Sequence, residues 1–100
     1  MQPQLVVYET ESCGWCRAFR EDIAPVYMRS KHASWATLRY VDLNDADDGK
    51  QFKLARGISA LPTLVLVDTA GREVSRMSGH PGEPANVYRF LDKNLARIAP

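Results

Sequence analysis

The sequence predicts one α/β domain, in which helices cover both faces of a mixed four-stranded sheet. Short apolar runs alternate with segments of helical periodicity, in the order β-α-β-α-β-β-α. With 100 residues, of which 45% are hydrophobic, the chain can bury the core of one domain but not of two. No repeat, low-complexity tract or linker divides it. We therefore expect a single domain over residues 1–100.

The first strand and helix flank a short polar break. Leu5–Tyr8 is apolar and β-branched, as in a buried strand. After Glu11–Gly14, apolar side chains recur at helical spacing, at Cys16, Phe19, Ile23, Val26 and Tyr27. Pro25 lies inside this pattern and should kink the helix, because proline has no N–H to donate.

A second strand and a second helix are predicted next. Thr37–Leu43 has the composition of a strand. The acidic cluster that follows it, residues 44–48, contains residue types that cap helices. We expect a helix from there to Arg56, with Gly57 as its C-terminal stop.

The last third of the chain predicts a hairpin and a final helix. Thr63–Val67 and Glu73–Met77 are strands joined by the turn-forming run 68–71. Pro84 suits the first position of a helix whose apolar face carries Val87, Phe90, Leu91, Asn94, Leu95 and Ile98. The helix between the first two strands makes them parallel, and the hairpin adds an antiparallel pair. Helices on both faces of this sheet give an α/β sandwich.

Charge and hydropathy exclude several classes of protein. Lys and Arg total 13 and Asp and Glu total 12, a net charge of +1, so no basic face is expected for nucleic acid. No apolar run approaches the roughly 20 residues that a membrane span needs, and we expect no membrane insertion. The first residues lack the features of a signal peptide. The chain is thus expected to be a cytosolic protein or a mature secreted domain with an added Met.

The two cysteines carry the clearest chemical signal. Cys13 and Cys16 form a C-x-x-C motif that follows a strand and begins a helix. The positive end of a helix stabilises a thiolate. Cys13, nearer the exposed end, is therefore predicted to attack a disulfide. Cys16, one turn further along with Phe19, is predicted to resolve the mixed disulfide. The positive charge of Arg17 can add to the stabilisation of the thiolate, whereas the negative charges of Glu9 and Glu11 act against it.

Other interpretations of the motif are weaker. A zinc site would need further ligands, but His32 and His80 lie 48 residues apart and do not have zinc-ligand spacing. A structural disulfide over so short a loop would stabilise the fold little. A third alternative is a non-catalytic module that binds a peptide or a metal ion. We predict no metal site.

The sequence resembles the thioredoxin family in more than this motif. The segment Ile58–Leu64 is similar to the family's segment with a cis-proline before a strand, with Pro62 at that position. Pro25 matches the proline of the active-site helix, and Gly79 follows the hairpin as in the family. The likeness runs from about Val6 to Leu95. It implies a thioredoxin-like three-layer sandwich and a core of glutaredoxin size.

The resemblance also implies a function and a binding surface. It makes the protein a thiol–disulfide oxidoreductase that needs no cofactor beyond its own cysteine pair, and that works as a monomer with disulfide-containing substrates and an upstream electron donor. Leu61 would offer its backbone to an extended substrate beside cis-Pro62. Trp15 and Gly79 would line the docking groove, with His80 as an additional hydrogen-bonding group.

The sequence departs from the family pattern near the first strand. Many thioredoxins carry a buried carboxylate six residues before the first cysteine, where this chain has Val7. Residues two apart on a strand share a face, so Glu9 is our candidate for transferring the proton of Cys16. The alternative is a solvated charge at a strand end.

The direction of electron flow and the compartment stay open at this level. We expect a reductase. A disulfide oxidase or isomerase is the alternative, because the same sequence pattern is compatible with reduction potentials from about −270 to −120 mV. The single small domain is similar to periplasmic thioredoxin-like proteins of bacteria, including those tied to sulfur oxidation or cytochrome c maturation. We therefore expect a periplasmic protein, with the cytoplasm as the alternative.

Overall fold

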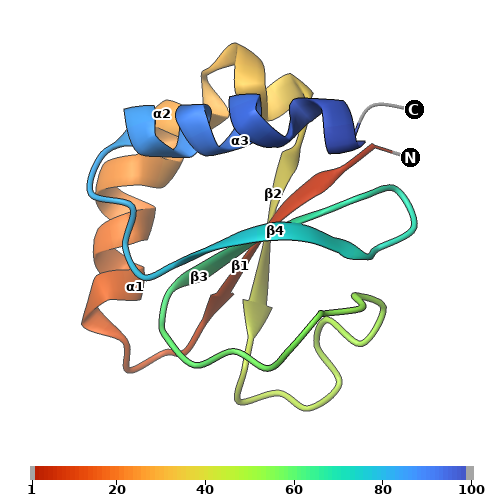
Figure 1. Cartoon of the computed structure of the whole chain (residues 1–100). Helices are drawn as coiled ribbons and strands as arrows, with labels where there is room; N and C mark the ends of the chain where they lie inside the picture. Colours follow the sequence, from red (N-terminus) through yellow and green to blue (C-terminus); the bar gives the residue numbers. More distant parts are fainter. Residues whose placement is uncertain (1, 99–100) are drawn as a thin grey trace.

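A mixed four-stranded sheet forms the centre of the protein (Figure 1). The computed structural model describes residues 2–98. Its elements are β1 (Gln4–Glu9), α1 (Gly14–Ala18), the π-helical turn η1 (Phe19–Ile23), α2 (Ala24–Met28), the 3-10 turn η2 (Lys31–Ser34), β2 (Thr37–Asp42), β3 (Thr63–Val67), β4 (Glu73–Ser78) and α3 (Pro84–Ile98). The strand order is β2-β1-β3-β4. β1 is parallel to β2, whereas β3 is antiparallel to both β1 and β4, so the predicted sheet is confirmed.

The helices cover one face of this sheet. α1, α2 and α3 lie on the same side in Figure 1. Alternate residues of the central strands point toward them, namely Leu5 and Val7 on β1 and Leu64 and Leu66 on β3. These side chains are at most 1% exposed and pack with Phe19, Ile23, Tyr27, Val87 and Leu91 from the helical side. This cluster is the main core.

The opposite face is covered by irregular chain, and this corrects the prediction. We predicted a helix from the acidic cluster at 44–48 to Arg56, but the described structure has only turns there and an isolated bridge at Lys53. The acidic side chains bond to turn amides: Asp42 accepts from the N–H of Asn44, and Asp45 from that of Asp47. These local bonds compete with helix formation. The segment 43–62 therefore forms the third layer, and helices on both faces were a wrong prediction.

The segment 43–62 still closes a second core. Phe52 is buried, and Leu54, Ile58 and Leu61 pack partly buried beside it. They cover Val6, Tyr8, Val41, Val65 and Val67, which point away from the helices. Both faces of β1 and β3 are thus apolar, which explains why these strands have continuous apolar sequences.

The first helix carries its predicted interruption. α1 and α2 are joined by η1, where the N–H of Ala24 bonds to the carbonyl of Phe19 in the i to i−5 pattern of a π-helix. Pro25 follows at once and has no N–H to offer. The last helix begins at Pro84, as predicted.

Candidate active site

The cysteine pair lies where β1 gives way to α1. Cys13 is the N-cap of α1, with extended dihedrals of φ −82° and ψ 111°. Its Sγ accepts the backbone N–H of Cys16 at 3.1 Å, which places the sulfur at the positive end of the helix. Cys13 and Cys16 form a disulfide with a Cα–Cα distance of 5.2 Å, within the usual range for such a bond. The start of α1 thus brings the two cysteines close enough to form this bond.

The two sulfur-bearing residues differ in exposure. Cys16 is 2% exposed and belongs to the buried face of α1, whereas Cys13 is half-buried. A partner disulfide can reach the outer cysteine more easily than the inner one. This asymmetry supports the predicted roles of Cys13 as attacking and Cys16 as resolving thiol.

A groove next to Cys13 brings together most of the predicted substrate-binding residues. It is lined by Trp15, Leu61, Gly79, His80 and Gly82. Trp15 is 66% exposed, and its ring centroid lies 5.6 Å from that of His80. The groove is thus a largely apolar surface, formed by segments far apart in the sequence.

Pro62 holds two residues that line this groove, Leu61 and Gly79, in place. The Leu61–Pro62 bond is cis, as the resemblance implied. Pro62 itself is buried, and its carbonyl accepts the N–H of Gly79 at 2.8 Å. This bond joins the loop before β3 to the end of β4. Pro62 therefore positions Leu61 and Gly79 on the two sides of the groove.

His80 is held in one tautomer in the groove. Its Nδ1 accepts the N–H of Gly82 at 2.9 Å, so the proton of the neutral ring is assigned to Nε2. That Nε2 is buried and has no partner among the described residues. Gly82, with φ +89°, was not singled out from the sequence. The signal for it was the pair of glycines that brackets His80 and Pro81.

A second cavity reaches the inner cysteine. It is lined by Cys16 together with Glu9, Thr10, Glu11, Arg17, Arg20 and Asp42. Glu9, only 15% exposed, is held by Arg20, whose Nε donates to Glu9 Oε1 at 3.0 Å. The guanidinium of Arg20 also lies 3.8 Å from the ring centroid of Tyr40. Glu9 is therefore an ion-paired carboxylate beside Cys16 and not a freely solvated charge.

Arg20, the partner of Glu9, is a residue of this cavity that the sequence interpretation missed, as it missed Thr10 and Asp42. Its pKa is raised, first by the hydrogen bonds to Glu9. The available signal was its position four residues after Cys16, on the same side of the helix. Arg17, which was predicted to tune the pair, also lines the cavity, and its guanidinium donates to the carbonyl of Glu11 at 3.3 Å. Val7 is buried in the core on the helical face.

This fold and this cysteine pair define a thiol–disulfide oxidoreductase with a thioredoxin fold. Residues 1–94 match the family described as thioredoxin-like domain. The chain therefore belongs to this family, as the resemblance in the sequence indicated. Its chemistry uses the disulfide itself as the redox group and requires no other cofactor. Within residues 2–98, no three His, Cys, Asp or Glu side chains are grouped to hold a metal ion.

Solved structures agree with this assignment. The reduced periplasmic thioredoxin SoxS from Paracoccus pantotrophus is 28% identical, with a TM-score of 0.74 over 97% of this chain and 95% of that one. A thioredoxin from Fasciola hepatica is 20% identical, with a TM-score of 0.65 over 92% and 80% of the two chains. The DsbH oxidoreductase is 18% identical, with a TM-score of 0.58 over 91% and 71%. The last two likenesses show the fold alone.

None of the helices within residues 2–98 has the length and apolarity to span a membrane.

Proposed function

We propose that this protein is a monomeric reductase of protein disulfides. In the reduced enzyme, the Cys13 thiolate attacks a substrate disulfide and releases one substrate thiol. Cys16 then loses its proton and attacks Cys13 Sγ, which releases the second thiol and leaves the Cys13–Cys16 disulfide. Two electrons pass to the substrate in each cycle. An upstream dithiol donor returns them to the enzyme.

The observation that carries the direction of transfer is the acidic lining beside Cys16. Three carboxylates, those of Glu9, Glu11 and Asp42, line this cavity, against the two guanidinium groups of Arg17 and Arg20. An excess of negative charge disfavours a thiolate. Strong disulfide oxidants depend on a stabilised reduced form. The lining gives Cys16 no such stabilisation beyond what the start of the helix gives Cys13, and this favours a reducing enzyme.

The groove beside Cys13 supports a protein or peptide as the substrate. Trp15 offers exposed aromatic surface, and Leu61 precedes cis-Pro62 at the edge of the groove. We propose that the backbone of Leu61 pairs with an extended substrate segment, while Trp15 and Gly79 contact its side chains. This arrangement presents the substrate disulfide to Cys13.

We also propose that the protein works in a bacterial periplasm. The support is the likeness to SoxS, a periplasmic thioredoxin, which is 28% identical over 97% of this chain. Subcellular fractionation of the source organism, with antibody detection, tests this. Recovery of the protein with cytoplasmic markers would exclude the periplasmic assignment.

The central test is insulin reduction with dithiothreitol as the electron donor. The wild-type protein is expected to accelerate precipitation of the insulin B chain, and Cys13→Ser to abolish this activity. Cys16→Ser should trap substrates as mixed disulfides, which are detected by mass spectrometry. Activity that persists in Cys13→Ser would refute the redox function.

The reduction potential separates a reductase from an oxidase. Equilibration with glutathione and alkylation of the free thiols gives this potential. We expect a value near that of thioredoxin, about −270 mV. A value near that of strong oxidants, about −120 mV, would favour the oxidase.

A further inference from the structure

A second, larger groove lies between α3 and the edge strand β4. It is lined by residues 75–81 together with Asn86, Arg89, Phe90, Lys93, Asn94 and Arg97; we call it the α3–β4 groove. In Figure 1, α3 runs back along β4, with its N-terminal end near the end of that strand. The groove shares Gly79 and His80 with the substrate groove, so a chain bound at Cys13 can continue into it.

The charge of the α3–β4 groove is of one sign. Its described lining contains four cationic residues and no Asp or Glu. Arg76 is buried and neutralised by Glu73, which leaves Arg89, Lys93 and Arg97 as exposed cations on α3. A protein with a net charge of only +1 thus concentrates positive charge along one side of one helix.

Neutral amides hold two of these cations in position. Arg89 donates to Oδ1 of Asn86, and Arg97 donates to Oδ1 of Asn94 at 3.2 Å. An amide orients a guanidinium without cancelling its charge. Within residues 2–98, the carboxylate found within 4 Å of these cations is that of Glu83, 3.9 Å from Arg89 and 64% exposed, a distance and exposure at which pairing is weak. Within residues 2–98, Lys93 has no ion-pair partner.

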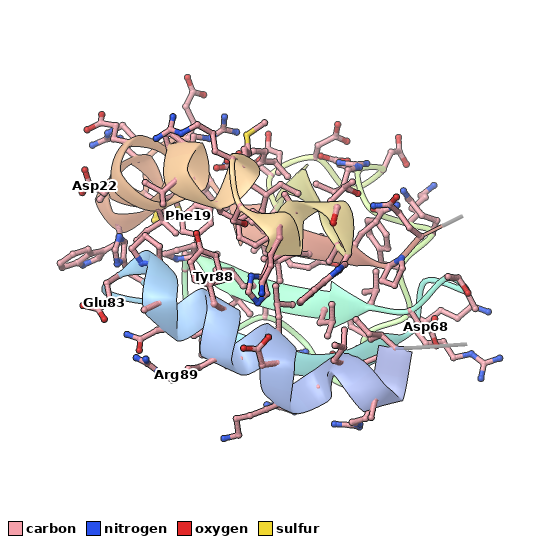
Figure 2. The ribbon with its side chains drawn as sticks, turned by 90° about the horizontal axis from the view of Figure 1, so that it is seen from above. Phe19, Asp22, Asp68, Glu83, Tyr88 and Arg89 are labelled. Carbon is pink, nitrogen blue, oxygen red and sulfur yellow. A yellow bond between two sulfur atoms is a disulfide. The ribbon has the colours of Figure 1, made fainter. Side chains whose placement is uncertain are left out.

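The spacing of the cations matches an extended chain. Residues four apart on a helix are separated by about 6 Å along its axis, and alternate residues of a strand by about 6.6–6.8 Å. β4 lies at the edge of the sheet. Its first residue, Glu73, donates its N–H to the carbonyl of Lys53, and within residues 2–98 the rest of its outer edge offers backbone groups to an added strand. Figure 2 shows Arg89 projecting from the side of α3 that faces away from α1 and α2.

We propose that the α3–β4 groove binds an acidic, extended segment of the substrate protein. Acidic side chains at alternate positions of that segment would meet Arg89, Lys93 and Arg97, while its cysteine lies in the groove beside Cys13. The preferred substrates are therefore disulfide proteins with an acidic stretch near the reactive cysteine. This inference rests on the proposed reduction of protein disulfides and names the substrate class of the same site.

Three matched peptides test the substrate preference. Each peptide carries one cysteine in a disulfide with an aromatic thiol whose release is followed by absorbance, and the peptides have Glu, Gln or Lys at three alternate positions. We expect wild-type kcat/KM for the Glu peptide to exceed that for the Gln peptide about tenfold at low salt. The Lys peptide should be the poorest substrate. High salt should reduce the preference, because it screens exposed charges.

Charge-reversal variants locate the effect. R89E/K93E/R97E should lose the preference for the Glu peptide and turn over the Lys peptide faster than the Glu peptide. The control R29E/K50E/R72E makes the same change in net charge on exposed residues outside the groove, and it should keep the wild-type preference. An unchanged preference in the groove variant, or an equal loss in the control, would overturn the proposal.

A binding measurement separates this inference from the proposed function. The Glu peptide with Ser in place of its cysteine should bind wild-type protein and shift the NMR signals of Lys93 and Arg97, even if turnover fails. Inactivity on all three peptides would count against the reductase, and absence of these shifts would count against the groove. Tighter binding of a single-stranded oligonucleotide at the same residues would overturn the assignment to a peptide.

Discussion

The carboxylate of Glu9 is held by the guanidinium of Arg20 at the wall of the cavity that reaches Cys16. Glu9 ends β1 and Arg20 lies in η1, so the ion pair joins the strand and the helix that flank the cysteine pair. The ring of Tyr40 lies against the guanidinium of Arg20 and limits its movement. We therefore expect this carboxylate to exchange a proton with the Cys16 thiol of the reduced enzyme.

Replacement of Glu9 by Gln should slow the step in which Cys16 attacks. A buried thiol must lose its proton before it attacks, and Gln cannot accept a proton. We expect insulin reduction to slow about tenfold or more, the mixed disulfide to accumulate, and the pH profile to change. Rapid-quench measurement of mixed disulfide against pH checks this.

The matched control for Glu9→Gln is Glu11→Gln. Glu11 lines the same cavity but is exposed, and its replacement should leave the shape of the pH profile unchanged. Arg20→Lys should keep a cation near Glu9 and retain more activity than Arg20→Gln. A Glu9→Gln profile identical to that of the wild type would remove Glu9 from proton transfer.

Trp15 provides a second prediction, on substrate binding. The side chain is 66% exposed at the groove, so Trp15→Ala should change the free energy of unfolding by less than about 0.5 kcal/mol. Loss of the aromatic contact should lower kcat/KM for protein disulfides about tenfold. Reduction of a small aromatic disulfide should change much less, because such a molecule does not fill the groove.

Met28→Ala is the control for Trp15→Ala. Met28 is also 66% exposed, but it lies at the far end of α2, outside the groove. Its replacement should leave both activities intact. If Trp15→Ala reduces insulin at the wild-type rate, the groove does not contribute to substrate binding.

The sequence predicts the sheet well because each strand carries its own signal. The apolar runs of β1 and β3 reflect burial on both faces, and Pro84 and Pro25 mark local backbone constraints. The helix predicted after β2 was wrong, because the same Asp and Asn residues that cap helices also stabilise turns. Tertiary contacts of Phe52 and Arg76 decide whether a helix or a series of turns forms here, and the local sequence pattern does not contain these contacts.

The site was predictable where its residues are close in sequence. Cys13, Trp15 and Cys16 lie within one turn of helix, and the resemblance to thioredoxins supplied Leu61, Pro62 and Gly79. Arg20 was missed because its partner Glu9 is eleven residues away on another element. The cationic groove was missed because the overall charge is near neutral, and only the packing of α3 on β4 shows which charges lie together.

Glu73 and Arg76 provide a prediction on pH and stability. Both side chains are nearly buried on β4 and form an ion pair at 2.7 Å. Arg76 also donates to the carbonyls of Arg56 and Gly57, and Glu73 accepts the N–H of Ala55. The pair thus fastens the segment 43–62 to the sheet. Hydrogen bonds from Arg76 are the main reason that the pKa of Glu73 lies below its usual 4.5.

A lowered folded-state pKa stabilises the protein above the unfolded-state value, and this stabilisation is lost as the pH falls through the folded-state pKa. Glu73→Gln should therefore lower the free energy of unfolding by about 3 kcal/mol at neutral pH. The difference from wild type should shrink below pH 4.5. Urea unfolding at a series of pH values measures it.

Glu83→Gln is the control for Glu73→Gln. Glu83 is 64% exposed and 3.9 Å from Arg89, so its replacement should change stability by less than about 0.5 kcal/mol at any pH. A loss in Glu73→Gln that stays constant from neutral to acid pH would contradict the ion-pair explanation.

Gly71 is predicted to be intolerant of any side chain. It lies in the β3–β4 turn with φ +83°, and a Cβ there would lie 2.9 Å from the backbone oxygen of Gln51. Gly71→Ala combines backbone strain with this clash, and we expect it to cost about 1–3 kcal/mol of stability in urea unfolding. The carbonyl of Gly71 accepts the N–H of Lys53 at 2.8 Å, so this amide should exchange faster with solvent in the variant.

Gly57→Ala is the matched control, because no atom lies within 4 Å of its Cβ position, and it should be neutral or stabilise by less than about 1 kcal/mol. Equal effects of the two substitutions would show that the turn at Gly71 does not hold the segment 43–62 in place.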